Sequence, residues 1–85
     1  MTRIERIRDS LLRGFPGATL TLEDESHLHA GHAGASTGRG HFRLKIVSPA
    51  FKGLNPIARH RAVYAALGDM MQTDIHALSI DARDA

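Results

Sequence analysis

The stretch HFRLKIVSPAFKGLNPIARHRAVYAAL, residues 41–67, decides the fold of this chain. Its first part alternates apolar and polar side chains, which is typical of a strand with one buried face. The apolar residues of that strand are Phe42, Leu44 and Ile46. Asn55 and Pro56 then favour a helix start, because Asn caps free amides and Pro fits the first helical position. A strand followed by a full helix predicts a parallel strand beside the first one.

The segment after this stretch completes the predicted crossover. The helix carries an apolar stripe and is expected to end near Gln72. The residues of the stripe are Val63, Ala66, Leu67 and Met70. A last strand is predicted over residues 75–82, where His76, Leu78 and Ile80 alternate with other side chains and so share one face. We expect this strand to lie parallel to the strand at residues 41–46.

The N-terminal part predicts one more helix and one more strand. Thr2 and Glu5 form a capping box at the helix start, and an apolar stripe follows. The stripe comprises Ile4, Ile7, Leu11 and Leu12. Gly14 is the expected C-cap of the helix, and Pro16 with Gly17 is the expected turn. Alternating residues 18–22 then predict a strand that forms an antiparallel hairpin with residues 41–46.

These elements predict one α/β domain over residues 1–85, in the order α-β-β-α-β. The region 48–54 is expected to turn, with a short helical turn around Ala50 and Phe51. Both helices can cover one face of a three-stranded mixed sheet, which gives a two-layer sandwich. The residues expected on the open face are Thr19, Thr21, Arg43, Lys45 and Ser79.

The composition limits the chemistry of the chain. Its 85 residues include no cysteine, so it forms no disulfide and supplies no thiolate to a metal or cluster. The net charge of +2 is compatible with nucleic-acid contact but does not argue for it. No apolar run approaches the ~20 residues of a membrane span, and the N-terminus has no signal-peptide pattern. We expect a protein of the bacterial cytoplasm, or of an organelle if an upstream targeting segment is missing from this sequence, without membrane contact. We find no nucleophile–base pair that predicts an enzyme.

The segment 25–40 is long for a hairpin connection and contains several glycines. It also carries His27, His29 and His32. Long connections of this kind are usually functional or disordered. The three histidines fit a nonspecific zinc, nickel or copper site, but they equally fit solvated polar filler.

Six short motifs resemble the BolA family, and together they span most of the chain. They are Asp24-Glu25-Ser26, His41-Phe42-Arg43, Val47-Ser48, Phe51-Lys52-Gly53, Arg59-His60-Arg61 and His76-Ala77-Leu78. The last two are the most specific in residue type, order and spacing. The fold of that family is similar to the type II KH domain, which agrees with the element order predicted above.

The resemblance implies an adaptor that binds a monothiol glutaredoxin and shares a [2Fe–2S] cluster with it, for cluster trafficking or iron and redox regulation. Glutaredoxin cysteine and glutathione would supply thiolates, and the isolated chain would bind no cluster. The resemblance implies that His76 is the metal ligand, whereas the pattern alone favours a partly buried structural histidine. Some bacterial members of the family are described instead as DNA-binding regulators of morphology and stress genes, which is the alternative function.

The second ligand implied by the resemblance is a loop histidine. His32 precedes the His-Phe pair by nine residues, which is the spacing of shorter loops in the family. Counting from the acidic stretch at residues 24–26 selects His29 instead. We take His32 as the expected ligand, with His29 in reserve and His27 as the weakest candidate.

Lys52 and Arg59 are the candidates for contact with a partner or with nucleic acid. Arg59 and Arg61 point roughly 160–200° apart on a helix, so they cannot both lie on one narrow surface. Arg59 is expected to contact glutathione or an acidic glutaredoxin surface. The turn at residues 53–56 lacks the second glycine of a KH loop, so only weak phosphate binding to DNA is expected near Lys52.

Overall fold

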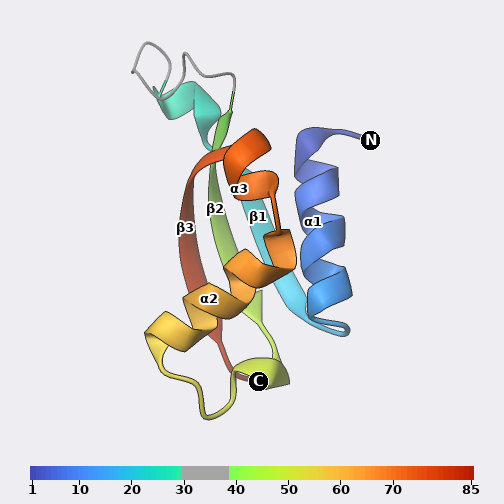
Figure 1. The fold of residues 1–85 in the computed structure, drawn as a ribbon, viewed down its shortest axis with the longest axis vertical. Helices are drawn as coiled ribbons and strands as arrows, with labels where there is room; N and C mark the ends of the chain where they lie inside the picture. The colour runs from blue at the N-terminus through green and yellow to red at the C-terminus, as the bar shows by residue number, and fades with distance from the viewer. Residues whose placement is uncertain (30–38) are drawn as a thin grey trace.

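Figure 1 shows the fold as a computed structural model, which describes residues 1–29 and 39–85. Its elements in chain order are α1 (Arg3–Gly14), β1 (Thr19–Asp24), the 3-10 turn η1 (Ser26–His29), β2 (Gly40–Val47), the 3-10 turn η3 (Pro49–Phe51), α2 (Pro56–Leu67), α3 (Met70–Thr73) and β3 (Ile75–Arg83). The long elements follow the predicted α-β-β-α-β order. None of the helices in the described ranges is long and apolar enough to cross a bilayer.

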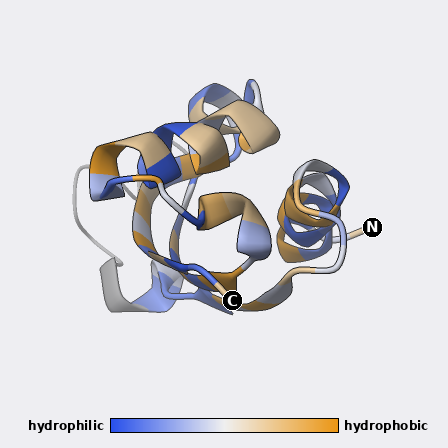
Figure 2. Cartoon of the chain, turned by 90° about the horizontal axis from the view of Figure 1, so that it is seen from below, coloured by the Kyte–Doolittle hydropathy of each residue, from blue (hydrophilic) through white to orange (hydrophobic). Residues whose placement is uncertain are grey.

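The sheet has three strands in the order β1-β2-β3. β1 pairs antiparallel with β2, and β3 pairs parallel with β2, as the strand–helix–strand pattern predicts. The helices lie on one side of the sheet, with α1 and α2 side by side over it (Figure 2). This confirms a two-layer α/β sandwich with a mixed sheet covered on one face.

The core lies between the sheet and the helices. The buried apolar residues are Ile7, Leu11, Phe15, Leu20, Phe42, Leu44, Ile46, Phe51, Val63, Leu67 and Ile75. Burying a side chain of this size contributes roughly 1.5–3 kcal/mol, so the alternation of apolar residues in β2 sets which face is covered. The five residues predicted on the open face are all exposed.

The capping box at the start of α1 forms as predicted. The Glu5 amide donates to Thr2 Oγ1 at 3.3 Å, and the Thr2 amide donates to Glu5 Oε1 at 3.2 Å. Asn55 caps α2 with a single side-chain bond, in which its Oδ1 accepts from the Ala58 amide at 2.8 Å. Local sequence signals therefore place both helix starts correctly.

Gly14 does not cap α1, because it is the last helical residue and Phe15 is the C-cap. Gly14 instead allows α1 to approach α2 closely. A Cβ atom added at Gly14 would lie 2.6 Å from Cβ of Ala66 in α2. Only glycine allows α1 and α2 to approach so closely without a shift of the backbone.

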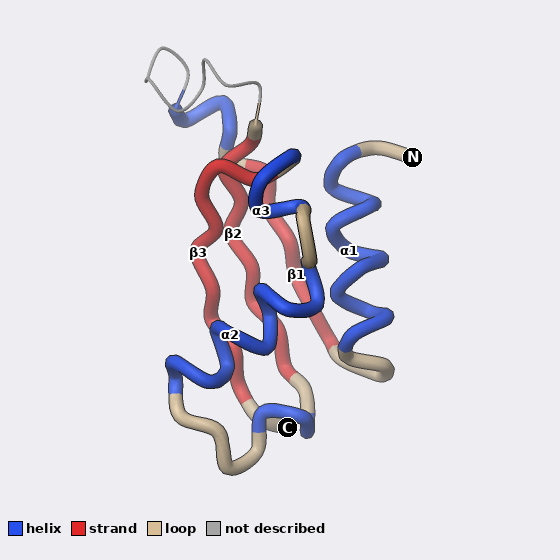
Figure 3. Tube along the Cα trace, viewed as in Figure 1, coloured by secondary structure: helices blue, strands red, loops and turns tan. Residues whose placement is uncertain are grey.

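The prediction of one helix from Pro56 to about Gln72 is wrong, because α2 ends at Leu67 and α3 begins at Met70 (Figure 3). Gly68 has φ +58°, in the left-handed region where an α-helix cannot continue. Its amide still donates to the Tyr64 carbonyl at 3.1 Å, which closes the last turn. The break lets α3 turn toward the start of β3.

We expect Gly14→Ala to lower the free energy of unfolding, although alanine is favoured over glycine within a helix by about 1 kcal/mol. The clash with Ala66 should outweigh that gain and leave a net loss of about 1–2 kcal/mol. The double substitution Gly14→Ala and Ala66→Gly should recover part of the loss. Urea unfolding measures both effects, and a single variant as stable as the wild type would contradict the close-contact explanation.

Candidate functional site

A bulge at the start of β3 determines where His76 lies. Gly40 pairs with Ile75 and His41 pairs with Ala77, so the register shifts and His76 is the extra residue. Ile75 is fully buried, whereas His76 and Ala77 are both exposed. The prediction that His76 shares the face of Leu78 and Ile80 is therefore wrong.

His76 packs beside His41 of β2. Their ring centroids are 5.1 Å apart with an interplanar angle of 48°. His41 belongs to the side of β2 that the helices do not cover, and it is half-buried. In the sequence, His41 stands out only as part of a family motif. The alternation of residues in β2 does not indicate that His41 contacts another histidine.

Arg39 is the second neighbour of His76. Its Nη2 lies 3.3 Å from His76 Nδ1, and its Nη1 donates to the Met71 carbonyl at 3.3 Å and the Gln72 carbonyl at 3.4 Å. These carbonyls belong to α3, and the carbonyls in the last turn of a helix have no amide donors within that helix. Arg39 thus links the start of β2 to α3 and to the exposed histidine. Its place in the site was not predicted, because a lone arginine after a glycine-rich segment carries no signal.

Gly40 allows the tight junction between these segments. A Cβ atom there would lie 2.6 Å from Cε2 of the Phe42 ring and 2.9 Å from Ser26 Oγ. The Gly40 amide donates to the Asp74 carbonyl at 2.9 Å, and the His41 amide donates to Ser26 Oγ at 3.1 Å. Strand β2, turn η1 and the α3–β3 junction therefore meet at one end of the sheet (Figure 1).

Asp74 fixes this junction to α1. Its Oδ1 accepts from Arg6 Nη2 at 2.9 Å and from Arg3 Nε at 3.3 Å, and its Oδ2 accepts from Thr73 Oγ1 at 3.0 Å. Burial raises the pKa of Asp74, but the hydrogen bonds from Thr73 and the two arginines outweigh burial and hold its pKa below the usual value. Asp74, two residues before the bulge residue His76, is thus held by a charged contact to the first helix.

The loop histidines are only partly covered by the structure. His32 lies outside the described residues, and His29 is the last residue of η1. His27 is exposed. Within residues 1–29 and 39–85, no group of three or more His, Cys, Asp or Glu could hold a metal ion. The choice among the loop histidines therefore stays a prediction.

Residues 11–85 match the family described as BolA-like protein. The chain belongs to the BolA-like family. Among its curated relatives, the chloroplastic BOLA1 protein of Arabidopsis thaliana is 43% identical over 81 residues, covering 92% of this chain and 51% of the relative. SufE-like protein 1 of the same organism is 42% identical over 83 residues, covering 92% of this chain and 22% of the relative. The chain thus spans about half, or less, of the length of these two relatives.

Solved structures agree with the fold of the BolA-like chain. The BolA domain of SufE1 from Arabidopsis thaliana has a TM-score of 0.84 at 41% identity, covering 99% of this chain and 93% of that domain. BolA1 from Mus musculus has a TM-score of 0.78 at 34% identity, with 99% and 66% covered. The predicted family and fold class are therefore both confirmed.

Of the two basic candidates, Lys52 is exposed and follows η3. Arg59 has a structural function instead. Its Nε donates to the Leu54 carbonyl at 2.8 Å, and its Nη1 donates to the Ala82 carbonyl at 3.0 Å. These bonds tie the start of α2 to the end of β3. The expected contact of Arg59 with glutathione or a partner gains no support from this arrangement.

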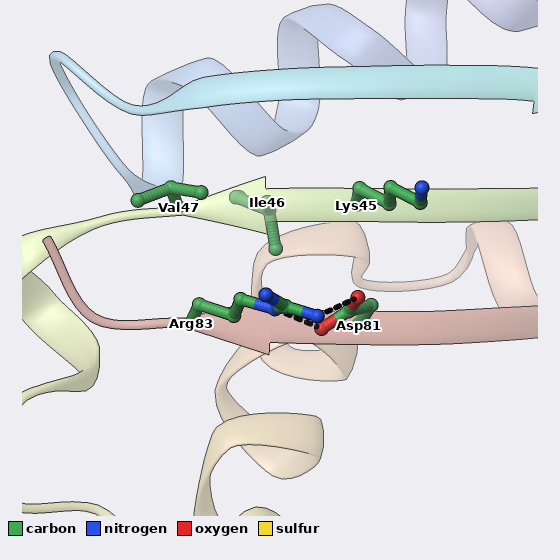
Figure 4. A pocket seen from close by; sticks show the side chains of 5 residues that line it. All are labelled: Lys45, Ile46, Val47, Asp81 and Arg83. Atoms are coloured by element: carbon green, nitrogen blue, oxygen red, sulfur yellow. Dashed lines mark hydrogen bonds and ion pairs between the residues drawn. The ribbon is translucent and has the colours of Figure 1, made fainter.

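A shallow depression lies at the other end of the sheet (Figure 4). It is lined by Lys45, Ile46, Val47, Asp81 and Arg83. Arg83 donates to both carboxylate oxygens of Asp81 at 3.0 and 3.1 Å, which lowers the pKa of Asp81. Asp81 follows His76 by five residues, about 17 Å along an extended strand, so this depression is separate from the histidine pair.

We expect Asp74→Asn to weaken the fold near neutral pH by about 1–2 kcal/mol, because its charged hydrogen bonds to α1 are lost. A lowered folded pKa means that Asp74 stabilises the wild type above about pH 4, the ordinary range for aspartate, and that this is lost as pH falls through the lowered value. Wild type and variant should therefore converge in acid. Urea unfolding across pH tests this, with Asp9→Asn, an exposed α1 residue, as control. Parallel curves for wild type and Asp74→Asn would contradict it.

Proposed function

We propose that this BolA-like chain is a non-enzymatic adaptor that binds a monothiol glutaredoxin and shares a [2Fe–2S] cluster with it through His76. The observation that carries the proposal is the bulge that exposes His76 beside Ala77 at the end of the sheet. A strand residue in regular alternation would have pointed the imidazole into the helix-covered side. The bulge instead leaves the imidazole exposed, as a contact with a second protein requires.

The donor set of the chain fits a shared cluster. The chain has no cysteine, so imidazole is the ligand it offers that is known in [2Fe–2S] centres, where two histidines replace two cysteines. The thiolates then have to come from glutaredoxin cysteine and from glutathione held by that partner. When bound, the cluster supplies redox-active iron, and histidine ligation raises its reduction potential.

The second ligand in this proposal is His32, with His29 in reserve. The two described ends of the histidine-bearing segment support a second ligand from this segment, whichever of its histidines it is. Ser26, at its start, bonds the His41 amide, and Arg39, at its end, contacts His76. Both described ends of the segment thus contact the histidine pair, which supports a histidine of the same segment as the second ligand.

Two further observations bear on the biological setting. SufE-like protein 1 of Arabidopsis thaliana is much longer than the stretch it shares with this chain, and the BolA domain of SufE1 has been solved as a structure of its own. A domain that occurs within a longer protein fits a module that acts through a partner. The cytoplasmic location stays part of the proposal, since some relatives are named as chloroplastic.

The DNA-binding alternative has less support from the described residues. Of its two basic candidates, Arg59 bonds backbone carbonyls and only Lys52 is exposed beside the turn. A single lysine neutralises about one phosphate, which gives a weak and salt-sensitive contact. Weak DNA binding therefore remains the alternative function. A spectrum identical to that of glutaredoxin alone in the cluster experiment would favour it.

The proposal is tested by visible absorption and circular dichroism of the chain mixed with a monothiol glutaredoxin, glutathione and a cluster source. The wild-type mixture should give a spectrum different from that of the glutaredoxin homodimer, because a histidine has entered the coordination sphere. His76→Ala should abolish that difference and keep the cluster-free complex, whereas His60→Ala, on α2, should leave the spectrum unchanged. If His76→Ala changes nothing, the ligand role of His76 is excluded.

The loop ligand is tested with three matched alanine variants in the same mixture. We expect His32→Ala to alter the spectrum, because it removes the second imidazole, whereas His29→Ala and His27→Ala should match the wild type. A change confined to His29→Ala would transfer the role to that residue. No change in any of the three would exclude ligation by the loop histidines.

A further inference from the structure

The contact between Arg39 and His76 has a chemical consequence for the proposed ligand. Arg39 Nη2 lies 3.3 Å from His76 Nδ1. A guanidinium group stays charged in proteins and has only N–H donors. The ring nitrogen that faces it can therefore only accept. The contact is a hydrogen bond only in the form of the neutral ring that carries its single proton on Nε2.

Iron requires a lone pair from the imidazole, and this ring has one lone pair, which Arg39 occupies. Ligation through Nδ1 requires Arg39 to move away. Ligation through Nε2 requires the ring proton to move to Nδ1, where the new N–H would face the N–H groups of Arg39. In either case the contact between the two residues has to break.

We propose that Arg39 guards His76 in the free chain, by holding its Nδ1 lone pair and releasing it only when His76 binds iron. The identity of the metal rests on the proposed function, whereas the protonation of the ring does not. Arg39 is thus a positioning residue that acts on His76 and is not itself a ligand.

The surroundings of Arg39 suit a reversible guard. Its Nη1 bonds the carbonyls of Met71 and Gln72, so the side chain has an anchor on α3 besides its contact with His76. The ring of His41 packs against His76, with the ring centroids 5.1 Å apart. The contact that has to break is one exposed hydrogen bond. Losing a bond of this kind changes the equilibrium between the held and the released His76 ring by about two- to tenfold.

The first test uses the isolated wild-type chain and needs neither a variant nor glutaredoxin. Long-range ¹H–¹⁵N correlation spectra report which nitrogen of each imidazole carries the proton. At about pH 8, where an ordinary histidine is neutral, we expect His76 to be in the Nε2–H form. A predominant Nδ1–H form would overturn the proposal.

The second test measures how available the lone pair of His76 is. Diethyl pyrocarbonate acylates imidazole at an unprotonated nitrogen, and peptide mass spectrometry gives the rate at His76 relative to His60. Arg39→Met keeps an unbranched, uncharged stem and removes the guanidinium donors, so the relative rate should rise by about two- to tenfold. Arg39→Lys, which restores a donor, should reverse part of the rise. Equal rates in the wild type and Arg39→Met would overturn the guard.

A control variant separates this effect from a general change in charge. Arg83→Met removes an exposed arginine from the other end of β3, where it pairs with Asp81, and it should leave the rate at His76 unchanged. If Arg39→Met loosens α3, far-ultraviolet circular dichroism will show the loss of structure, and the wild-type tautomer then decides the proposal.

The two proposals can fail separately. If His76→Ala leaves the cluster spectrum unchanged, the shared-cluster function is excluded while the tautomer and acylation results still stand. If the wild-type ring is in the Nδ1–H form, the guard is excluded even where the cluster experiment succeeds. The cluster-loaded complex offers a further readout. When glutaredoxin is limiting, a larger fraction of the clusters should show the histidine-ligated spectrum with Arg39→Met than with the wild type.

Discussion

The parallel pairing of β2 with β3 breaks register once, between Gly40 and His41, and the position of the candidate site depends on that break. An unbroken ladder would have kept strict alternation from Ile75 onward, and one of His76 and Ala77 would have faced the helices. The extra residue instead leaves Ile75 in the core and both following side chains outside. A bulge next to a functional residue is a common way to redirect a side chain.

Several contacts make this bulge possible and hold it. Gly40 allows the Phe42 ring and Ser26 to approach closer than any side chain would permit. Asp74, just before β3, connects the junction to α1 through Arg3 and Arg6. The exposed histidine is therefore supported by groups from the first helix, the hairpin and the short helix α3, although these groups are far apart in the sequence.

Local signals were sufficient for most of the fold. The alternation in residues 42–46, the cap at Asn55 and the capping box at Thr2 each act within a few residues, so periodicity and hydrogen-bonding chemistry indicate them directly. The errors arose where the deciding contact is distant or subtle. The apolar stripe through Met70 predicts a continuous helix and does not indicate the break at Gly68. Gly14 fits a C-cap by sequence, but the residue that it contacts, Ala66, lies on another helix.

The sequence by itself determined the element order, the buried face of β2, the family, and the absence of any thiolate ligand, because these follow from composition and from short-range patterns. Only the tertiary structure decided that His76 is exposed, that His41 packs beside it and that Arg39 Nη2 lies 3.3 Å from its ring nitrogen Nδ1. The physical reason is that these contacts depend on the register between two strands joined by a whole helix. A shift of one residue there moves a side chain to the other face, and no local pattern reports such a shift.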